Sequence, residues 1–255
     1  MWNGSIIFGL VSIPIKLYSG SEEQRLDLNM LDRRDSARIR YKRVNENTGK
    51  EVEWQDIVKG FATEKGYILL EKEDFEQANL KKSKTIDIEE FVAETEVAEV
   101  LFKQPYFMEP QKGGEKAYNL LHAALKQTGK LGVATFVMRE KEHLSLIGVY
   151  KKVLVLHLIR FAGEIRDPDE LKLIDQKVTD KEIKMAVSLI DQYTETFQLD
   201  KYKDVYNAQL KSIIEARIQG KQNKIVSFDS KPTPARDLMA QLQASLERKK
   251  KDKAA

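Results

Sequence analysis

Arginine and lysine are concentrated in one short segment, at a density suited to binding a polyanion. Residues 33–43, with the sequence RRDSARIRYKR, hold six basic residues and one acid. Arginine outnumbers lysine here, and its planar guanidinium can contact two oxygens of one phosphate. The run therefore predicts contacts to a phosphate backbone. The candidate residues are Arg33, Arg34, Arg38, Arg40, Lys42 and Arg43, together with Lys59 from the segment that follows.

Charge is segregated along the chain although the total is nearly balanced. The 43 Lys and Arg against 40 Asp and Glu leave a formal net charge of +3. Residues 68–110 hold eleven acids and five bases, whereas residues 211–253 hold eleven bases and five acids and end in ERKKKDK. This segregation predicts basic surfaces directed at one partner and an acidic lobe that avoids it. Lys249, Lys250 and Lys251 of the closing run are further candidates for contact with nucleic acid.

Residues with catalytic or metal-binding chemistry do not form a recognisable motif. The three histidines are far apart in sequence, cysteine is absent, and no Gly-Lys pair is followed by the Ser or Thr of a P-loop. We therefore expect no catalytic residue, no metal and no cofactor. The alternative is a metal-dependent nuclease that uses pairs of acids. Such pairs are Asp87 with Glu89 and Asp167 with Asp169, which the local pattern favours as solvated charges.

The first half of the chain predicts a β-rich body. Short runs rich in Ile, Val, Tyr and Phe are separated by Gly, Asn and Pro. These runs are SIIFGLVSIPIKLY, RIRYKRV, KEVEW, GYILL and TIDIEEFV. A helix is predicted over 116–127, and strands are predicted over 131–139, 144–150 and 153–161. We expect a mixed α+β fold, with a Greek-key or barrel-like body and a helix packed on it.

The basic run is predicted to form one arm of an antiparallel hairpin over 37–54. A strand would place Arg38, Arg40 and Lys42 on one face, with NENTG as the turn and residues 50–54 as the return strand. Eight extended residues span about 26 Å, long enough to cross a duplex. The alternative is an ordinary edge strand, in which cations serve to prevent aggregation.

Helical periodicity begins near residue 179. Thr179 and Glu182 have the spacing of a capping box, Asp200 is a candidate cap for a second helix, and Gly220 is a candidate stop. A last short helix is predicted after Pro232, and it is either a partner-binding surface or packed on the body. Its apolar positions are Leu238, Leu242 and Leu246.

The absence of cysteine fits a reducing, cytosolic compartment. The uncharged opening at residues 2–15 has no basic leader, contains Gly9 and Pro14, and is shorter than the roughly 20 residues that span a bilayer. We expect strand, turn and strand at this position and no secretion.

Several long blocks resemble, in order and over nearly the whole chain, the successive blocks of prokaryotic Ku. They are WNGSIIFGLVSIPIKLY, RIRYKRVNENTGKEVEWQDIVKG, EVLFKQPYFMEP, KAYNLLHAALKQTGKLGVATFVMREKEHL and AGEIRDPDEL. The resemblance implies a β-barrel core over 1–178, with a bridging insertion at about 25–66. The helical periodicity described above adds a helical arm over 179–220, followed by a linker, short helix and basic tail over 221–255.

The functional implications of this resemblance are also specific. A homodimeric ring would hold double-stranded DNA ends through backbone and shape rather than sequence. It would act without catalysis in non-homologous end joining, recruit an ATP-dependent ligase of the ligase D type, and be cytoplasmic and nucleoid-associated. An RNA-binding or purely protein-interacting barrel is the remaining alternative. One departure is that Asn45 and Thr48 occupy positions where many relatives carry a Cys-x-x-Cys pair, which excludes a thiolate metal site in that turn.

Overall fold

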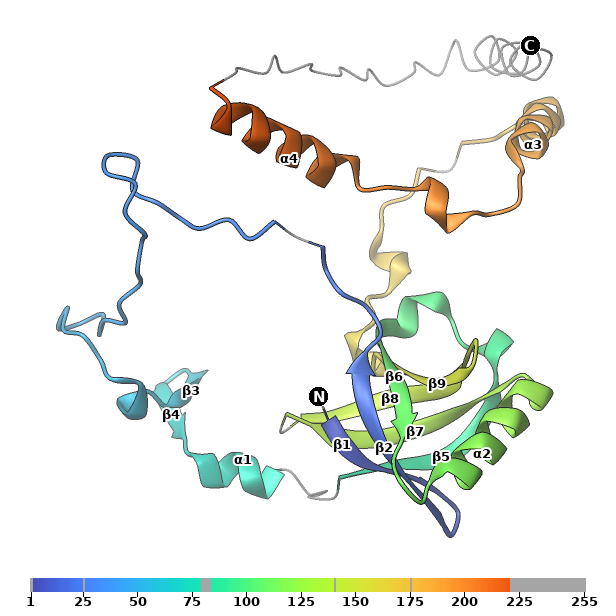
Figure 1. Ribbon diagram of the computed structural model, residues 1–255, viewed down its shortest axis with the longest axis horizontal. Helices are drawn as coiled ribbons and strands as arrows, with labels where there is room; N and C mark the ends of the chain where they lie inside the picture. The colour runs from blue at the N-terminus through green and yellow to red at the C-terminus, as the bar shows by residue number, and fades with distance from the viewer. Residues whose placement is uncertain (1, 25, 79–83, 140, 175, 221–255) are drawn as a thin grey trace. The chain divides into compact units, whose positions relative to one another are not determined.

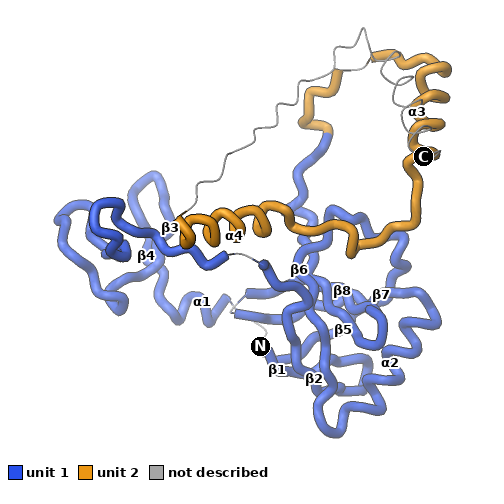
Figure 2. The backbone as a smooth tube through the Cα atoms, turned by 45° about the horizontal axis from the view of Figure 1, so that its top comes forward, with its two compact units in different colours: residues 1–168 blue, residues 169–255 orange. Residues whose placement is uncertain are grey.

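In the computed structural model, residues 2–24, 26–78, 84–139, 141–174 and 176–220 are described. The chain divides into two units, Met1–Pro168 and Asp169–Ala255 (Figure 2). Each unit has its own elements.

Seven strands of the described first unit close into a barrel in the order β1-β2-β6-β9-β8-β7-β5 (Figure 1). Neighbouring strands are antiparallel except for β1 and β5, whose parallel pairing closes the barrel. Closure leaves no free edge around the barrel. The strands are β1 (Trp2–Phe8), β2 (Val11–Ser19), β5 (Thr85–Ala93), β6 (Phe102–Pro110), β7 (Lys130–Met138), β8 (Lys141–Tyr150) and β9 (Val153–Ile159).

Alternating apolar residues fill the barrel interior. Along β7 every second side chain from Gly132 to Met138 is buried, as expected for a strand with one face on a core. Helix α2 (Glu115–Thr128) contributes Tyr118, Leu121 and Leu125 to the same core and ends at Gly129, whose φ of +63° allows the left-handed cap. The predicted barrel-like body, its helix and its last three strands are thereby confirmed.

The first two strands form the expected strand, turn and strand. Gly9, with φ +59°, lies in the turn between β1 and β2, and Ile6 pairs with Ile13 across the ladder. Both side chains are fully buried, so the opening segment belongs to the core.

A long insertion separates β2 from β5. It contains β3 (Lys59–Thr63), β4 (Gly66–Leu70) and α1 (Lys72–Ala78). Of these three elements, only β4 was predicted from the sequence, as the run GYILL. The predicted strands RIRYKRV and KEVEW are wrong as regular strands, because the described backbone pairs there only at Leu31 with Arg38 and at Val44 with Glu51. Without a third strand or a packed face, a two-stranded ribbon has little to stabilise it.

Short 3₁₀ turns connect the larger elements. They are η1 (Trp54–Asp56), η2 (Glu94–Glu96), η3 (Glu99–Leu101), η4 (Ala162–Glu164), η5 (Pro168–Glu170) and η6 (Leu199–Lys201).

The second unit contains α3 (Asp180–Tyr193) and α4 (Val205–Ile218). The predicted capping box of α3 is confirmed, because Glu182 N–H donates to the Thr179 hydroxyl and Thr179 N–H donates to the Glu182 carboxylate at 2.7 Å. Asp200 does not cap α4. Asp204 does, accepting from Asn207 N–H at 3.0 Å, because Asp200 lies one turn too early, in η6.

Neither α3 nor α4 has a buried residue within the described part of the chain. Apolar side chains such as Ile190 and Tyr206 remain exposed on these helices. Within the described residues, no helix combines the length and apolar character needed to cross a membrane.

Candidate nucleic-acid interface

The six basic residues of the run 33–43 are all exposed in the insertion between β2 and β5. Two compact turns, rather than one long ladder, organise the backbone that carries them. We call residues 30–54 the basic arm.

The first turn of the basic arm is closed by Asp32. Its backbone N–H donates to Ala37 O and its carbonyl accepts from Ser36 N–H, both at 2.8 Å, while Ser36 adopts φ +59°. The Asp32 carboxylate holds the guanidinium of Arg34 at 2.6 Å and also accepts from Arg34 N–H. This contact lowers the pKa of Asp32 and raises that of Arg34. Arg34 is therefore partly neutralised by its own turn.

The second turn of the basic arm is closed by Asn45. Asn45 N–H donates to Lys50 O at 2.9 Å, and the side-chain oxygen of Asn45 accepts from the backbone N–H groups of Asn47 and Thr48 at 3.0 Å. Gly49, with φ +65°, completes the reversal. Amide hydrogen bonding thus closes the turn at the positions where the Cys-x-x-Cys pair is missing.

Two side-chain contacts cross this turn, and each joins diagonal neighbours of the antiparallel register set by Val44 opposite Glu51. Lys42 Nζ lies 2.7 Å from Glu51 Oε2. The Arg43 guanidinium lies 4.5 Å from the centre of the Trp54 ring. Trp54 and Glu51 are functional neighbours that the composition of the run did not indicate, although a hairpin register would have paired both with the run.

Three arginines remain uncompensated. Arg33, Arg38 and Arg40 form no ion pair with any described residue. Lys59 lies on β3 with its ammonium 4.7 Å from the ring centre of Phe75 in α1, so it is held within its own hairpin and helix. Within the run 33–43, the cations that have neither an ion pair nor a ring contact with a described residue are therefore arginines, which suit paired contacts to phosphate oxygens.

The same insertion exposes large apolar side chains. None of the described residues of 21–78 is buried. Tyr41 is 79% exposed, Trp54 72% and Leu28 66%. An apolar surface of this kind is characteristic of segments that are covered by another molecule.

The remaining candidates fall elsewhere. Lys249, Lys250 and Lys251 of the tail and Leu238, Leu242 and Leu246 of the last predicted helix lie outside the described residues. Of the acids proposed for a nuclease, Asp87 and Glu89 lie on β5, where Asp87 accepts from Thr85 and Glu89 accepts from Thr135 at 2.7 Å. The other pair, Asp167 and Asp169, flanks Pro168 at the start of η5. Within the described residues, no three His, Asp or Glu side chains gather as a metal site.

The fold and the site together define a β-barrel protein with an exposed, arginine-rich insertion. The family model described as the Ku70/Ku80 beta-barrel domain matches residues 7–185. The chain belongs to the Ku family.

Curated relatives match over nearly the full chain. The non-homologous end joining protein Ku of Coxiella burnetii is 37% identical, over 99% of this chain and 96% of the relative. The protein of the same name from Archaeoglobus fulgidus is 35% identical, over 96% of this chain and 97% of the relative. The protein of the same name from Bacillus subtilis is 36% identical, over 97% of this chain and 81% of the relative.

Proposed function

We propose that the protein binds the ends of double-stranded DNA, independently of sequence, and acts in the repair of double-strand breaks by non-homologous end joining. The observation that carries this proposal is the set of three exposed, unpaired arginines in the basic arm, Arg33, Arg38 and Arg40. Exposed guanidinium groups suit phosphates, which carry no sequence information. The names of the relatives support the same role.

The binding species is a homodimer whose two arms close a ring around the duplex. Support comes from the apolar side chains that the insertion leaves exposed, because a second copy of the same surface would bury them. Threading then explains a preference for ends, since a closed ring can reach a duplex only where the duplex terminates.

The protein works by binding and recruitment, not by catalysis, at the DNA of the nucleoid. Its partner is an ATP-dependent ligase of the ligase D type, and the helix predicted from the sequence around Leu238, Leu242 and Leu246 is the proposed docking element. Lys249, Lys250 and Lys251 add contacts to DNA outside the ring.

Binding to linear and relaxed circular DNA of one sequence tests the proposal. Linear duplex should bind far more tightly at matched salt, and complexes should become trapped when the ends are ligated shut. Sedimentation should give about twice the 29.4 kDa chain mass. Equal affinity for circles and linear fragments contradicts the ring.

The same experiment with magnesium and with EDTA separates binding from nuclease action. A complex that persists in EDTA without cleavage supports binding alone. Cleavage above background in magnesium supports the nuclease alternative, and tighter binding to duplex RNA than to duplex DNA supports the RNA-binding one.

A further inference from the structure

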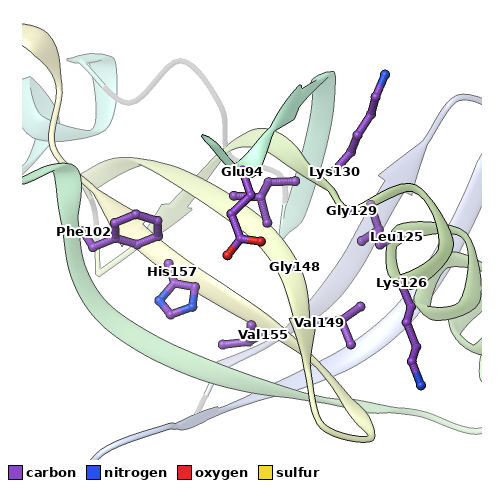
Figure 3. A pocket seen from close by; sticks show the side chains of 11 residues that line it. Glu94, Phe102, Leu125, Lys126, Gly129, Lys130, Gly148, Val149, Val155 and His157 are labelled. Atoms are coloured by element: carbon purple, nitrogen blue, oxygen red, sulfur yellow. The ribbon is translucent and has the colours of Figure 1, made fainter. Parts of the chain in front are cut away.

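A cavity of about 260 Å³ opens on the barrel beside the C-terminal end of α2, away in sequence from the basic arm. Residues from α2, β6, β7, β8, β9 and η2 line it (Figure 3). Its volume admits a single large side chain and is below the roughly 300–1,000 Å³ of sites that enclose drug-sized ligands.

Backbone irregularities create this cavity. The ladder between β6 and β9 shifts register between Phe102 and Pro105, opposite His157. Gly129 turns the chain at the end of α2 with φ +63°. Gly148 lines the cavity and has no side chain to fill it. A Cβ at Gly148 would lie 2.8 Å from Leu131 Cδ2, so a side chain there would disturb the lining. Bulges of this kind commonly reshape a sheet next to a binding site.

Two polar side chains that form no hydrogen bond with a described residue line the cavity, the exposed Glu94 and the half-buried His157. The Glu94 carboxylate points toward the His157 ring (Figure 3). The ring of Phe102 meets His157 edge-on at 5.2 Å. Burial lowers the pKa of His157, which Glu94 opposes only in part, so the imidazole is neutral at pH 7 and able to accept a hydrogen bond.

The other charges at the cavity are directed outward. Lys126 and Lys130 line the rim, but their ammonium groups extend away from Glu94 and His157 (Figure 3). Apart from the two lysines and two glycines, the other side chains of the lining are apolar, and they include Val149 and Val155. The inner chemistry is therefore one carboxylate, one neutral imidazole and an apolar wall.

We propose that this cavity binds one cationic side chain, a lysine or an arginine, presented by a short segment of a partner protein. An apolar stem with a charged end matches the apolar wall and the carboxylate beyond it. The ammonium or guanidinium donates to Glu94 and to His157, which satisfies both groups. The surroundings favour a basic segment as well, because Glu96 is exposed on the same η2 turn, two residues after Glu94.

DNA does not fit the same site. A phosphate would meet the Glu94 carboxylate within the cavity and further acids beside it, and like charges repel. The cavity is accordingly a protein-binding site that operates independently of the basic arm.

Binding of labelled, end-capped pentapeptides to the full-length protein tests the proposal. The probes are Gly-Leu-Arg-Leu-Gly, its lysine counterpart, and counterparts with norleucine or glutamate at the centre. The arginine and lysine peptides should bind at least about tenfold more tightly than the norleucine peptide, because a hydrogen bond to a charged group is worth about one order of magnitude or more. Equal binding by the norleucine or glutamate peptide overturns the proposal.

Matched variants locate the site. Glu94→Gln should weaken binding of the arginine peptide by at least about tenfold. Glu99→Gln removes the same charge outside the lining and should leave the affinity within twofold of the parent's. Equal effects of the two substitutions show general attraction to an acidic surface and overturn the proposal. Amide spectra of the unsubstituted protein provide a readout that does not depend on a variant's folding. Gly129 and Gly148 should shift on titration, and unmoved signals exclude this cavity.

Two further binding experiments define the ligand. N-acetyl-arginine amide should bind more weakly than the pentapeptide, and equal affinity would identify a free guanidinium compound in place of a protein segment. Linear duplex should leave peptide binding unchanged, and competition between them would assign the cavity to the DNA interface. Glu94→Gln should retain end binding, so this proposal and the DNA-binding proposal fail separately.

Discussion

The guanidinium of Arg43 lies over the exposed indole of Trp54, 4.5 Å from the ring centre. The two residues are diagonal neighbours across the turn that Asn45 and Gly49 close, although the backbone on either side forms no regular strand. A guanidinium held by its face keeps its N–H edges available for other acceptors. We therefore expect Trp54 to position Arg43 for a phosphate contact in the proposed DNA complex.

Trp54→Leu should weaken DNA end binding by about two- to fivefold, since a solvent-exposed cation–π contact is worth roughly 0.5–1 kcal/mol. Because Trp54 is exposed and has no buried contacts to lose, the free energy of unfolding should stay within about 0.5 kcal/mol of the parent's. Electrophoretic mobility shift at fixed salt measures the first effect and chemical denaturation the second.

Trp54→Phe serves as the matched control, because an aromatic face is retained and affinity should return to within about twofold of the parent. Fluorescence adds a direct readout. The chain has two tryptophans, and Trp2 donates from its indole to Val137 O inside the barrel, so iodide quenching reports mainly Trp54. If DNA gives no protection from iodide, Trp54 lies outside the interface.

Glu51→Gln should strengthen DNA binding. The Glu51 carboxylate, 2.7 Å from Lys42 Nζ, competes with phosphate for that ammonium. Removing its charge frees one cation in each protomer, so the dependence of log K on log salt should steepen by up to about 0.9 per protomer. Glu46→Gln is the control, since Glu46 lies in the same turn without an ion pair to a described residue. Equal steepening by both substitutions would indicate a change in net charge alone.

Much of the barrel was predictable because its signals are local. The strands over 130–159 are runs rich in Val, Leu and Ile, and the helix ending at Gly129 has both its apolar stripe and its stop in the sequence. The capping box at Thr179 and Glu182 is equally local. In each case a short window contains both the element and the reason for it.

The insertion was harder to predict because none of its described residues is buried in a core of its own chain. RIRYKRV has the composition of a strand, yet in the described chain it pairs only at Arg38 and Val44, since no neighbouring strand continues the ladder. Strand propensity expresses packing on a pleated surface, and this segment has no such surface within its own chain. The domain boundaries at 178 and 220 stay predictions.

The cavity could not be predicted either. Glu94 and His157 are distant in sequence, and they face each other only because the barrel closes and β6 shifts register against β9. Neither residue belongs to a motif. A single sequence carries no signal for a site assembled in this way.

Tyr118→Phe should destabilise the barrel by about 1–3 kcal/mol. The buried hydroxyl donates to Met108 O and accepts from Leu154 N–H, both at 2.7 Å, and these two residues are partners across β6 and β9. Phenylalanine leaves both backbone groups without their partner. The urea midpoint measures the loss, and Tyr206→Phe, on an exposed ring of α4, should leave it unchanged.

The contribution of Glu164 should depend on pH. Hydrogen bonds from Lys103 Nζ, the shorter at 2.8 Å, and from Phe161 N–H lower the pKa of Glu164. A carboxyl with a lowered folded-state pKa stabilises the fold above its unfolded pKa of about 4.3, and the contribution is lost as pH falls through the folded value. The urea midpoints of the parent and Glu164→Gln should therefore differ at pH 6 and converge toward pH 3. A constant gap across this range contradicts the assignment.

Arg40→Ala tests the phosphate contacts of the basic arm most directly, because Arg40 is exposed in the run and forms no ion pair with a described residue. Each phosphate contact releases counterions and steepens log K against log salt by about 0.9. A homodimer loses two contacts, so the slope should fall by up to about 1.8 without any gain of sequence preference.

Arg34→Ala is the matched comparison, because Asp32 already holds the Arg34 guanidinium at 2.6 Å. Its removal should change the slope less than removal of Arg40, since a cation paired within the protein releases fewer counterions on meeting phosphate. The free energy of unfolding of both variants should lie within about 0.5 kcal/mol of the parent's, as is usual for surface substitutions. A slope unaffected by Arg40→Ala, with the melting temperature also unaffected, would mean that DNA is held by another face and that the arginines of this arm are ordinary solvated charges.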